Sequence, residues 1–279
     1  MSDARPIGVF DSGSGGLTVA RAILDSHPGE SLLYVGDTAR FPYGPRSLEE
    51  IRGYALEIAA YLVGRNVKML VVACNSIEVA AIEEVTRAAG LPVVGVIDPG
   101  VRAAVRATHN GRVGLIGTEA TVRSGAYERA VARTGQDIRL VSQACPVFVE
   151  YVERGDTASE ELFGIARDYL APLQAAGVDT LILGCTHYPL LAGLISFVMG
   201  PDVRLISSAE ETAKDVFATL LRAGLLSSDG SYPSHEFVCT GDPVQFRRIA
   251  EVFLGPSIPE VRVAVPGGFQ ATAGVAPWS

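Results

Sequence analysis

The sequence predicts an α/β fold built from two similar halves, each a mostly parallel sheet flanked by helices. Three observations carry this prediction: short apolar runs alternate with amphipathic stretches, the runs are rich in Val, Ile and Leu, and three landmarks recur at near-constant spacing. Strands that are apolar on both faces are typical of parallel sheets covered by helices on both sides. We therefore expect two pseudo-symmetric α/β domains with a cleft between them.

Eight apolar runs are predicted strands. In chain order they read PIGVF, SLLYVGD, VKMLVVAC, LPVVGVID, RVGLIG, DIRLVS, VDTLILGC and VRLIS. Between them, LEEIRGYALEIAAYLVGR and SEELFGIARDYLAPLQAAG carry apolar residues at helical spacing. After Ser207 we expect a helix (SAEETAKDVFATLLRAG), a strand (HEFVCTGD) and a helix (PVQFRRIAEVFLG) that pack back on the first half.

The two halves share three landmarks in the same order. GVFDS begins at Gly8 and GLIGT at Gly114, an offset of 106. The cysteines of VKMLVVACNS and VDTLILGCTH, Cys74 and Cys185, are 111 residues apart, and the isoleucines of VVGVID and VRLIS are 109 apart. Such self-similarity indicates a repeated unit. We assign residues 1–97 plus 208–265 to a first, discontinuous domain, 98–207 to a second, and 266–279, which lack periodicity, to a disordered tail.

Composition and charge exclude several classes of function. The chain has 279 residues, a net charge of −8 and a pI near 5.1, which disfavours nucleic-acid binding because that needs clustered Lys and Arg. Its apolar runs are shorter than a membrane span, and MSDARPIGVFDSG lacks the layout of a signal peptide. We expect a cytoplasmic protein whose four cysteines are free thiols, because none forms a C-x-x-C pair.

Cys74 and Cys185 end equivalent predicted strands, and small polar residues follow each, in the runs ACNS and GCTH. Ligands of open parallel sheets bind beyond the carboxyl ends of the strands, next to helix N-termini. Residues of the N-cap type can hold a carboxylate there, and a helix N-terminus lowers a thiol pKa from about 8.5 toward neutrality. One such cysteine could equally be a buried small hydrophobe. Two at matching positions predict a catalytic pair flanking one cleft.

Fewer classes of reaction need two thiols in one site than need a single thiol. A metal site needs three or four ligands, and the spacing gives no compact His/Cys set. A cysteine protease needs one nucleophile with its base, which leaves the second thiol unexplained. Racemisation of a carbon acid explains both, because one group removes the α-proton from one face while the other supplies a proton to the opposite face.

A pyridoxal phosphate cofactor is disfavoured by the lysines. The sequence has two, Lys68 and Lys214. Lys68 begins a strand, at the wrong end of the sheet, and Lys214 lies inside a predicted helix, so neither is placed for a Schiff base. Cys145 and Cys239 have no counterpart in the other half, and we expect both to be structural.

Polar residues near the predicted strand ends complete the candidate site. FDSGSGGLTV is not a nucleotide phosphate loop, because Gly-Lys-Ser/Thr is missing. In it, Asp11 could accept a substrate ammonium, assist the first thiol, or simply cap a helix. The PYG run around Tyr43 could wall the cleft. Glu153 falls near the equivalent place in the second half, and His187 is either a helix-end polar group or an acid/base helper of the second thiol.

The runs GVFDSGSGGLTV, YVGDTARFPYG, VVACNS, GTEATVRSGAY, FVEYVERG and LGCTHYPLL together resemble the glutamate racemases of bacterial peptidoglycan synthesis. The similarity extends from about Ile7 to about Gly255. It implies a cofactor-independent, metal-free interconversion of L- and D-glutamate in a cleft between two pseudo-symmetric α/β domains. Family members commonly pair, so the resemblance also favours a homodimer.

The family pattern implies a role for each matching residue. Cys74 would deprotonate D-glutamate with support from Asp11, and Cys185 would deprotonate L-glutamate with support from Glu153 and His187. The implied substrate contacts are Asp11, Ser12, Tyr43, Gly44, Asn75, Ser76, Thr118, Thr121, Thr186 and His187.

The chain departs from the family pattern at three positions. Ser76 stands where threonine is usual, Glu150 where proline is common and Ser207 where aspartate is common, which puts loop packing and dimer geometry in doubt. Two other functions stay open: a racemase for aspartate or another small acidic amino acid, and a non-catalytic two-lobed amino-acid-binding protein.

Overall fold

The computed structural model describes residues 3–227, 232–255 and 261–264, and the predicted tail 266–279 lies outside these ranges. Within them the strands are β1 (Ile7–Asp11), β2 (Leu32–Gly36), β3 (Met69–Val72), β4 (Val93–Val94), β5 (Arg112–Gly117), β6 (Arg139–Ala144), β7 (Thr180–Gly184), β8 (Arg204–Ile206), β9 (His235–Cys239) and β10 (Val261–Val263).

The helices fill the intervals between these strands. They are α1 (Leu17–Ser26), α2 (Leu48–Gly64), α3 (Asn75–Ala89), α4 (Ile97–Ala107), α5 (Glu119–Arg123), α6 (Ala126–Arg133), α7 (Val147–Glu153), α8 (Glu160–Ala175), the 3₁₀ turn η1 (Tyr188–Leu191), α9 (Ala192–Met199), α10 (Ala209–Ala223) and α11 (Pro243–Leu254). Within the described ranges, no helix is long and apolar enough to cross a membrane.

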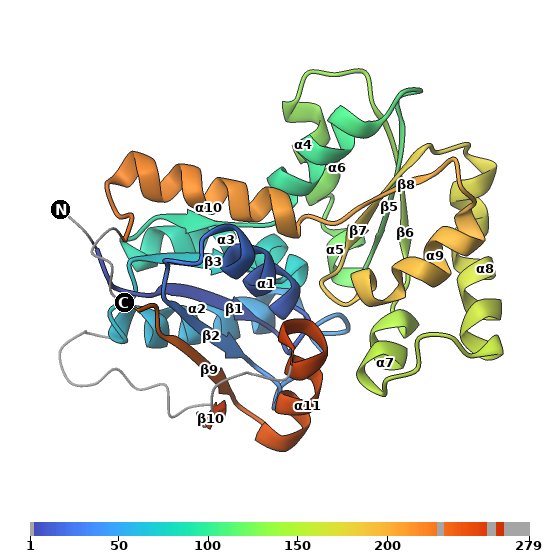
Figure 1. Cartoon of the computed structure of the whole chain (residues 1–279). Coiled ribbons are helices and arrows are strands. Elements are labelled where there is room, and N and C mark those ends of the chain that lie inside the picture. Colours follow the sequence, from blue (N-terminus) through green and yellow to red (C-terminus); the bar gives the residue numbers. More distant parts are fainter. Residues whose placement is uncertain (1–2, 228–231, 256–260, 265–279) are drawn as a thin grey trace.

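The strands form two separate parallel sheets, one in each lobe of Figure 1. The first has the order β10-β9-β2-β1-β3-β4 and the second the order β6-β5-β7-β8. The run β2-β1-β3-β4 therefore matches the second sheet strand for strand, with β1 equivalent to β5 and β3 to β7. The predicted α/β class and two-sheet architecture are confirmed.

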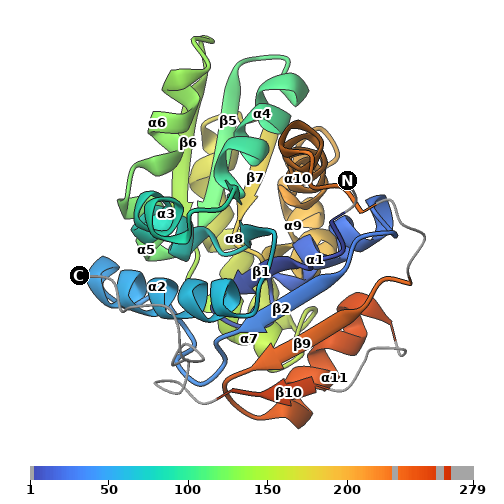
Figure 2. The same ribbon diagram turned by 90° about the vertical axis from the view of Figure 1, so that its left-hand side faces the viewer.

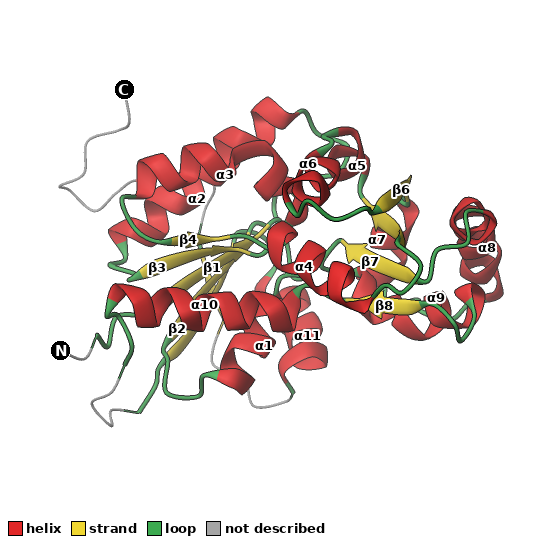
Figure 3. Ribbon diagram, turned by 90° about the horizontal axis from the view of Figure 1, so that it is seen from above, coloured by secondary structure: helices red, strands yellow, loops and turns green. Residues whose placement is uncertain are grey.

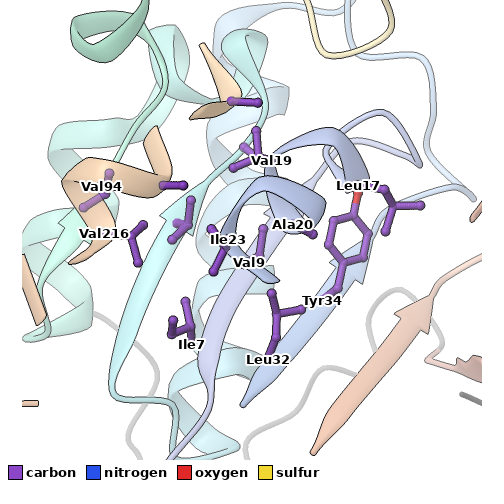
Figure 4. Packing of buried hydrophobic residues seen from close by; sticks show 14 of the residues in the cluster. Ile7, Val9, Leu17, Val19, Ala20, Ile23, Leu32, Tyr34, Val94 and Val216 are labelled. Carbon is purple, nitrogen blue, oxygen red and sulfur yellow. The ribbon is translucent and has the colours of Figure 1, made fainter. Parts of the chain in front are cut away.

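Helices cover both faces of the first sheet, as Figure 3 shows. Successive residues of a strand point to opposite faces. Val9 accordingly packs in the cluster that includes α1, α10 and α11, part of which Figure 4 shows, whereas Phe10 packs in the cluster with α2 and α3. The second sheet is covered in the same way, with α4 and α6 on one face and α7, α8 and α9 on the other.

Local signals explain where the helices next to the site begin and end. The helix α2 begins at a capping box, in which Ser47 Oγ accepts the N–H of Glu50 and the Glu50 carboxylate accepts the N–H of Ser47. The helix α3 follows β3 after two residues and ends at Gly90, whose φ of 61° is in the left-handed region. These boundaries fix the loops that surround the carboxyl ends of the strands.

The prediction and the structure differ at two strands. The run LPVVGVID forms a strand only at Val93–Val94, because α4 already begins at Ile97, where the buried Glu78 carboxylate accepts the N–H groups of Val96 and Ile97. The short edge strand β10 was not predicted. The predicted return of the C-terminal segment is confirmed, since β9 pairs with β2 and Figure 2 shows α11 beside β9 and β10.

Candidate active site

Both predicted thiols line one pocket at the carboxyl ends of the two sheets. Cys74 is the N-cap of α3, separated from the end of β3 by one residue, and Cys185 directly follows β7. Both cysteines are buried: Cys74 is 5% exposed and Cys185 is 7% exposed. The pocket encloses about 580 Å³ when its solvent-open part is counted. Equivalent strands of the two sheets therefore deliver one thiol each to a shared space.

Most of the other predicted contact residues line the same pocket. Ser12, Tyr43, Gly44, Asn75 and Ser76 come from the first sheet's side. The second side contributes Thr118, Thr186 and His187. Three predicted site residues lie behind the wall instead: Asp11, Thr121 and Glu153.

Asp11 lies behind Cys74 and holds the loop that follows β1. It is fully buried, and its Oδ2 accepts the N–H groups of Gly13 at 3.2 Å and Gly16 at 3.0 Å. A Cβ on Gly16 would lie 2.6 Å from the Asp11 Cβ, which explains the glycine there. The second oxygen, Oδ1, is buried and has no hydrogen-bond partner among the described residues, so contact of Asp11 with a substrate ammonium stays a prediction.

The surroundings of Cys74 disfavour its thiolate. Burial, followed by the negative charge of Asp11, raises the pKa of Cys74 well above its ordinary value. The hydrogen bond between the Cys74 sulfur and Ser12 Oγ, in which the thiol donates over 3.5 Å, and the contact with the N–H of Ile77 oppose this rise without overcoming it. The N-terminus of α3 does lower this pKa through the N–H of Ile77, but the expected net shift toward neutrality is wrong for Cys74, because the desolvation of the thiol outweighs the helix end.

The surroundings of Cys185 are different, because a basic side chain faces it. The sulfur lies 3.8 Å from Nδ1 of His187, whose Nε2 is 2.7 Å from Oε1 of Glu153. Burial of the imidazole opposes its charge, but the contacts with Cys185 and Glu153 outweigh it and raise the pKa of His187 to about 10. The Glu153 pKa is lowered, since the His187 and Ser14 hydrogen bonds exceed its burial penalty. His187 is therefore a buried imidazolium at neutral pH.

A set of hydroxyl and amide groups closes the pocket between the two thiols. Ser76 Oγ and Thr118 Oγ1 are 2.9 Å apart, and Thr118 Oγ1 donates to Thr121 at 3.1 Å. Asn75 Oδ1 accepts the Tyr127 hydroxyl at 2.7 Å, which leaves the amide N–H₂ as the group that Asn75 can offer to a ligand. Thr121 therefore contacts the pocket wall only through Thr118, and the Asn75 amide is the donor that this arrangement leaves open. Ser76 and Thr118 can donate to a carboxylate only when their hydroxyl groups rotate out of this chain.

Tyr43 lines the pocket with its ring and backbone only. Its hydroxyl donates to the buried Asp37 carboxylate, which also accepts from Arg40 Nε at 2.6 Å and from Thr240 Oγ1 at 2.7 Å. The Tyr43 hydroxyl is therefore engaged with Asp37, and contact of Tyr43 with a substrate through its other atoms stays a prediction. Gly44 lets the loop approach Thr118, since a Cβ there would lie 3.3 Å from the Thr118 Cβ.

The residues that depart from the family pattern fall at different places. Ser76 supplies the hydroxyl described above. Glu150 is exposed and lines the mouth of the pocket. Ser207 lies outside it, where its Oγ accepts the N–H of Ala209 at the start of α10. The remaining cysteines, Cys145 and Cys239, are buried and do not line the pocket. Cys145 packs in the same cluster as Cys185, whereas Cys239 lies on β9 of the first sheet.

Several residues of the site were missed by the sequence reasoning. Ser14 donates to Glu153, Phe41 stacks near the His187 ring with centroids 5.5 Å apart, and Tyr127 orients Asn75. The sequence offered only a weak signal for two of them: Ser14 is a second serine inside the glycine run SGSGG, and Phe41 directly precedes PYG. Further pocket residues not singled out as contacts are Pro42, Pro45, Pro146, Val149, Glu150 and Gly184.

The lysines lie away from the pocket. Lys68 is fully buried beside Glu30 and donates to the carbonyl of Asp3, just before β3 begins. Lys214 is on α10 and pairs with Glu211. Among the described residues, no group of three or more His, Cys, Asp or Glu side chains is arranged to hold a metal ion.

Comparison with known proteins identifies the family. A family model described as Asp/Glu/Hydantoin racemase matches residues 14–216. The chain belongs to this racemase family. It is 57% identical over 265 residues to the glutamate racemase of Parafrankia sp. (strain EAN1pec), with 95% of each chain covered.

Solved structures agree with this assignment. Glutamate racemase RacE1 from Bacillus anthracis has a TM-score of 0.87 at 43% identity, covering 94% of this chain and 97% of that one. Glutamate racemase from Francisella tularensis in complex with D-glutamate has a TM-score of 0.88 at 35% identity, covering 94% and 98%. Two-domain racemases therefore share the fold over nearly the whole chain.

Proposed function

We propose that this protein interconverts L- and D-glutamate without a cofactor, using Cys74 and Cys185 as two acid/base groups. The observation that carries the proposal is that two equivalent strands place one thiol each in the wall of a single pocket. A planar carbanion formed from an amino acid has two faces. A group on each face can remove or deliver the α-proton, and the two groups exchange roles when the reaction reverses.

On the Cys185 side, His187 supports the thiolate. The imidazolium beside the sulfur stabilises the negative charge that a base needs before it takes a proton, and Glu153 holds the imidazole in place. Following the family pattern, this side takes the α-proton of L-glutamate.

On the Cys74 side, the raised pKa favours the protonated thiol, which is the form that delivers a proton. The protonated Cys74 is therefore suited to act as the acid in the L-to-D direction, in which Cys185 would act as the base. In the opposite direction Cys74 must become the base for D-glutamate. A bound substrate ammonium would counter the charge of Asp11 and so lower the cost of that thiolate.

The hydroxyl and amide groups between the thiols hold the substrate carboxylates. Ser76, Thr118 and Thr186 offer hydroxyl groups, and Asn75 offers an amide, at the pocket wall. Such donors stabilise charge that builds on the α-carboxylate as the proton leaves, and they act in a site that excludes most water.

Circular dichroism tests the proposal against its alternatives. The purified protein is incubated separately with L-glutamate, D-glutamate and L-aspartate, and the optical signal is followed to equilibrium. Loss of signal with both glutamate enantiomers but not with aspartate supports the proposal. Loss with aspartate alone establishes the related racemase, and a constant signal with all three substrates supports a non-catalytic binding protein.

The cellular setting follows from the proposed reaction. D-glutamate is a component of peptidoglycan, so the protein would supply it in the cytoplasm for cell-wall synthesis and for the maintenance of cell shape. We further propose that it functions as a homodimer and needs neither nucleic acid nor membrane as a partner. We also keep the domain boundaries as proposed from the sequence: residues 1–97 with 208–265, and residues 98–207.

A further inference from the structure

We propose that Ser14 is a positioning residue for the Cys185 side of the pocket, although it lies in the loop of the first sheet that serves Cys74. The inference rests on the proposed racemase function and adds a residue to it. Ser14 is 1% exposed, and its Oγ donates to Oε1 of Glu153 at 2.9 Å. The hydrogen bond joins residues 139 apart in the chain and crosses from the loop after β1 to α7.

The hydrogen bond reaches the sulfur through two further contacts. The same oxygen of Glu153 that accepts from Ser14 is 2.7 Å from His187 Nε2, and His187 Nδ1 is 3.8 Å from Cys185 Sγ. Glu153 is thus held by donors from both halves of the molecule. With Ser14 gone, only His187 would direct this carboxylate oxygen, and the imidazole would lose part of its fixed orientation toward the thiol.

The loop around Ser14 is built to hold that serine in place. Asp11 Oδ2 accepts the N–H groups of Gly13 and Gly16 on either side of it. Gly15 allows the loop to lie directly against the second half, since a Cβ there would be 2.4 Å from Thr186 Oγ1 and 2.7 Å from His187 Nδ1. The Ser14 hydroxyl therefore meets Glu153 from a backbone that is fixed before any ligand binds.

Removing the Ser14 hydroxyl is expected to affect mainly one of the two proton transfers, the one at Cys185. Ser14 has its link to Cys185, whereas Cys74 contacts the neighbouring Ser12. Loss of the Ser14 hydroxyl should therefore raise the barrier for proton transfer at Cys185 more than at Cys74. The two enantiomers have equal free energies, so kcat/KM must stay equal in the two directions for every variant. Rates measured at low substrate therefore cannot reveal which proton transfer is slowed. Isotope effects on kcat/KM can reveal it, because each deuterated enantiomer loses its deuterium to a different thiol.

The experiment compares deuterium isotope effects on kcat/KM for L-glutamate and D-glutamate, each deuterated at Cα, in the full-length protein. The variant Ser14→Ala should lower kcat/KM about threefold to tenfold. Its isotope effect should rise with deuterated L-glutamate, whose deuterium moves to Cys185, and fall with deuterated D-glutamate. Ser14→Thr keeps the hydroxyl and should restore both values, because Ser14 also borders a small cavity beside Glu153 and Phe246.

The matched control is Thr18→Ala, which removes a hydroxyl from the first turn of α1 that donates to the Gly15 carbonyl of the same loop instead of to Glu153. An unchanged ratio of the two isotope effects in Ser14→Ala, or the same shift in Thr18→Ala, overturns the inference while leaving the racemase function intact. Ser14→Gly carries the same test if Ser14→Ala does not fold. Absence of glutamate racemisation by the unsubstituted protein overturns both proposals.

Discussion

The two sides of the pocket share a topology but differ in their electrostatics. Cys74 and Cys185 follow equivalent strands, yet a carboxylate lies behind the first thiol and an imidazolium faces the second. Burial and Asp11 raise the pKa of Cys74, while Cys185 has a cationic neighbour whose own pKa is raised to about 10. The repeated unit thus determines where the sulfurs lie, and the positions at which the two halves differ determine what surrounds them. Asp11 stands where the second half has Gly117, and His187 stands where the first half has Ser76.

This difference has a functional meaning. A symmetric pair of thiols would give no preference for which one begins as base. In the proposed mechanism, the Cys185–His187 contact and the protonated Cys74 define one starting state, and reversal requires a proton to leave Cys74 near the charge of Asp11. The following predictions test this comparison in order of decreasing effect.

The largest effect is expected from removing either sulfur. Cys74→Ala and Cys185→Ala should each lower glutamate racemisation by about 10³-fold, because a positioned acid/base group contributes about 10² to 10⁴. Polarimetry or circular dichroism in both directions measures this loss. Cys239→Ala is the matched control, since that thiol is also buried but lies on β9 outside the pocket, and it should retain activity. Full activity of either pocket variant in both directions would refute the two-thiol account.

A smaller effect is expected from His187→Gln. The substitution removes the cation that supports the Cys185 thiolate, so kcat/KM should fall by about 10- to 100-fold, below the loss from removing a sulfur. Its dependence on pH between 6 and 10 should also change, because the group with a pKa of about 10 is gone. His27→Gln, whose imidazole contacts the Ala213 carbonyl in a remote helix pair, should leave rate and pH profile unchanged. An unaltered pH profile in His187→Gln would argue against the role of the imidazolium.

On the opposite side, Asp11→Asn should lower the pKa of Cys74. The substitution removes the negative charge that is the second cause of the raised pKa, after burial. Alkylation of Cys74 at a series of pH values, followed by mass spectrometry of its peptide, reports the midpoint. The midpoint should move to lower pH, while that of Cys145, measured in the same digest, stays where it was. A midpoint of Cys74 that stays the same or rises would show that Asp11 does not set this pKa.

The smallest effect is on stability. The folded-state pKa of His187 is raised from 6.5 to about 10, so its contribution is complete below pH 6.5 and is lost as the pH rises to about 10. Urea unfolding of the unsubstituted protein and His187→Gln should therefore differ by about 1.5 to 3 kcal/mol at pH 6 and by less at pH 10. A difference that grows with pH would contradict the assigned charge state.

The sequence was sufficient to predict the α/β class, the two sheets and the meeting of the thiols, because strand periodicity and the offset of 111 residues are visible in the chain. The sequence was not sufficient to predict the raised pKa of Cys74, because the burial that raises it is a property of the folded core. The turned-away hydroxyl of Tyr43 depends on Asp37, and the Ser14–Glu153 bond joins segments far apart in sequence. Such contacts arise from tertiary packing and leave no periodic signal.

The most direct test of the two-thiol account is racemisation of L-glutamate in D₂O, with deuterium at Cα measured separately in substrate and product during the first few per cent of reaction. The account predicts that the D-glutamate formed carries solvent deuterium while the remaining L-glutamate keeps its protium, because one thiol removes the proton and the other delivers a different one. D-glutamate that retains the substrate's own protium, or equal deuterium in both enantiomers from the start, would contradict it.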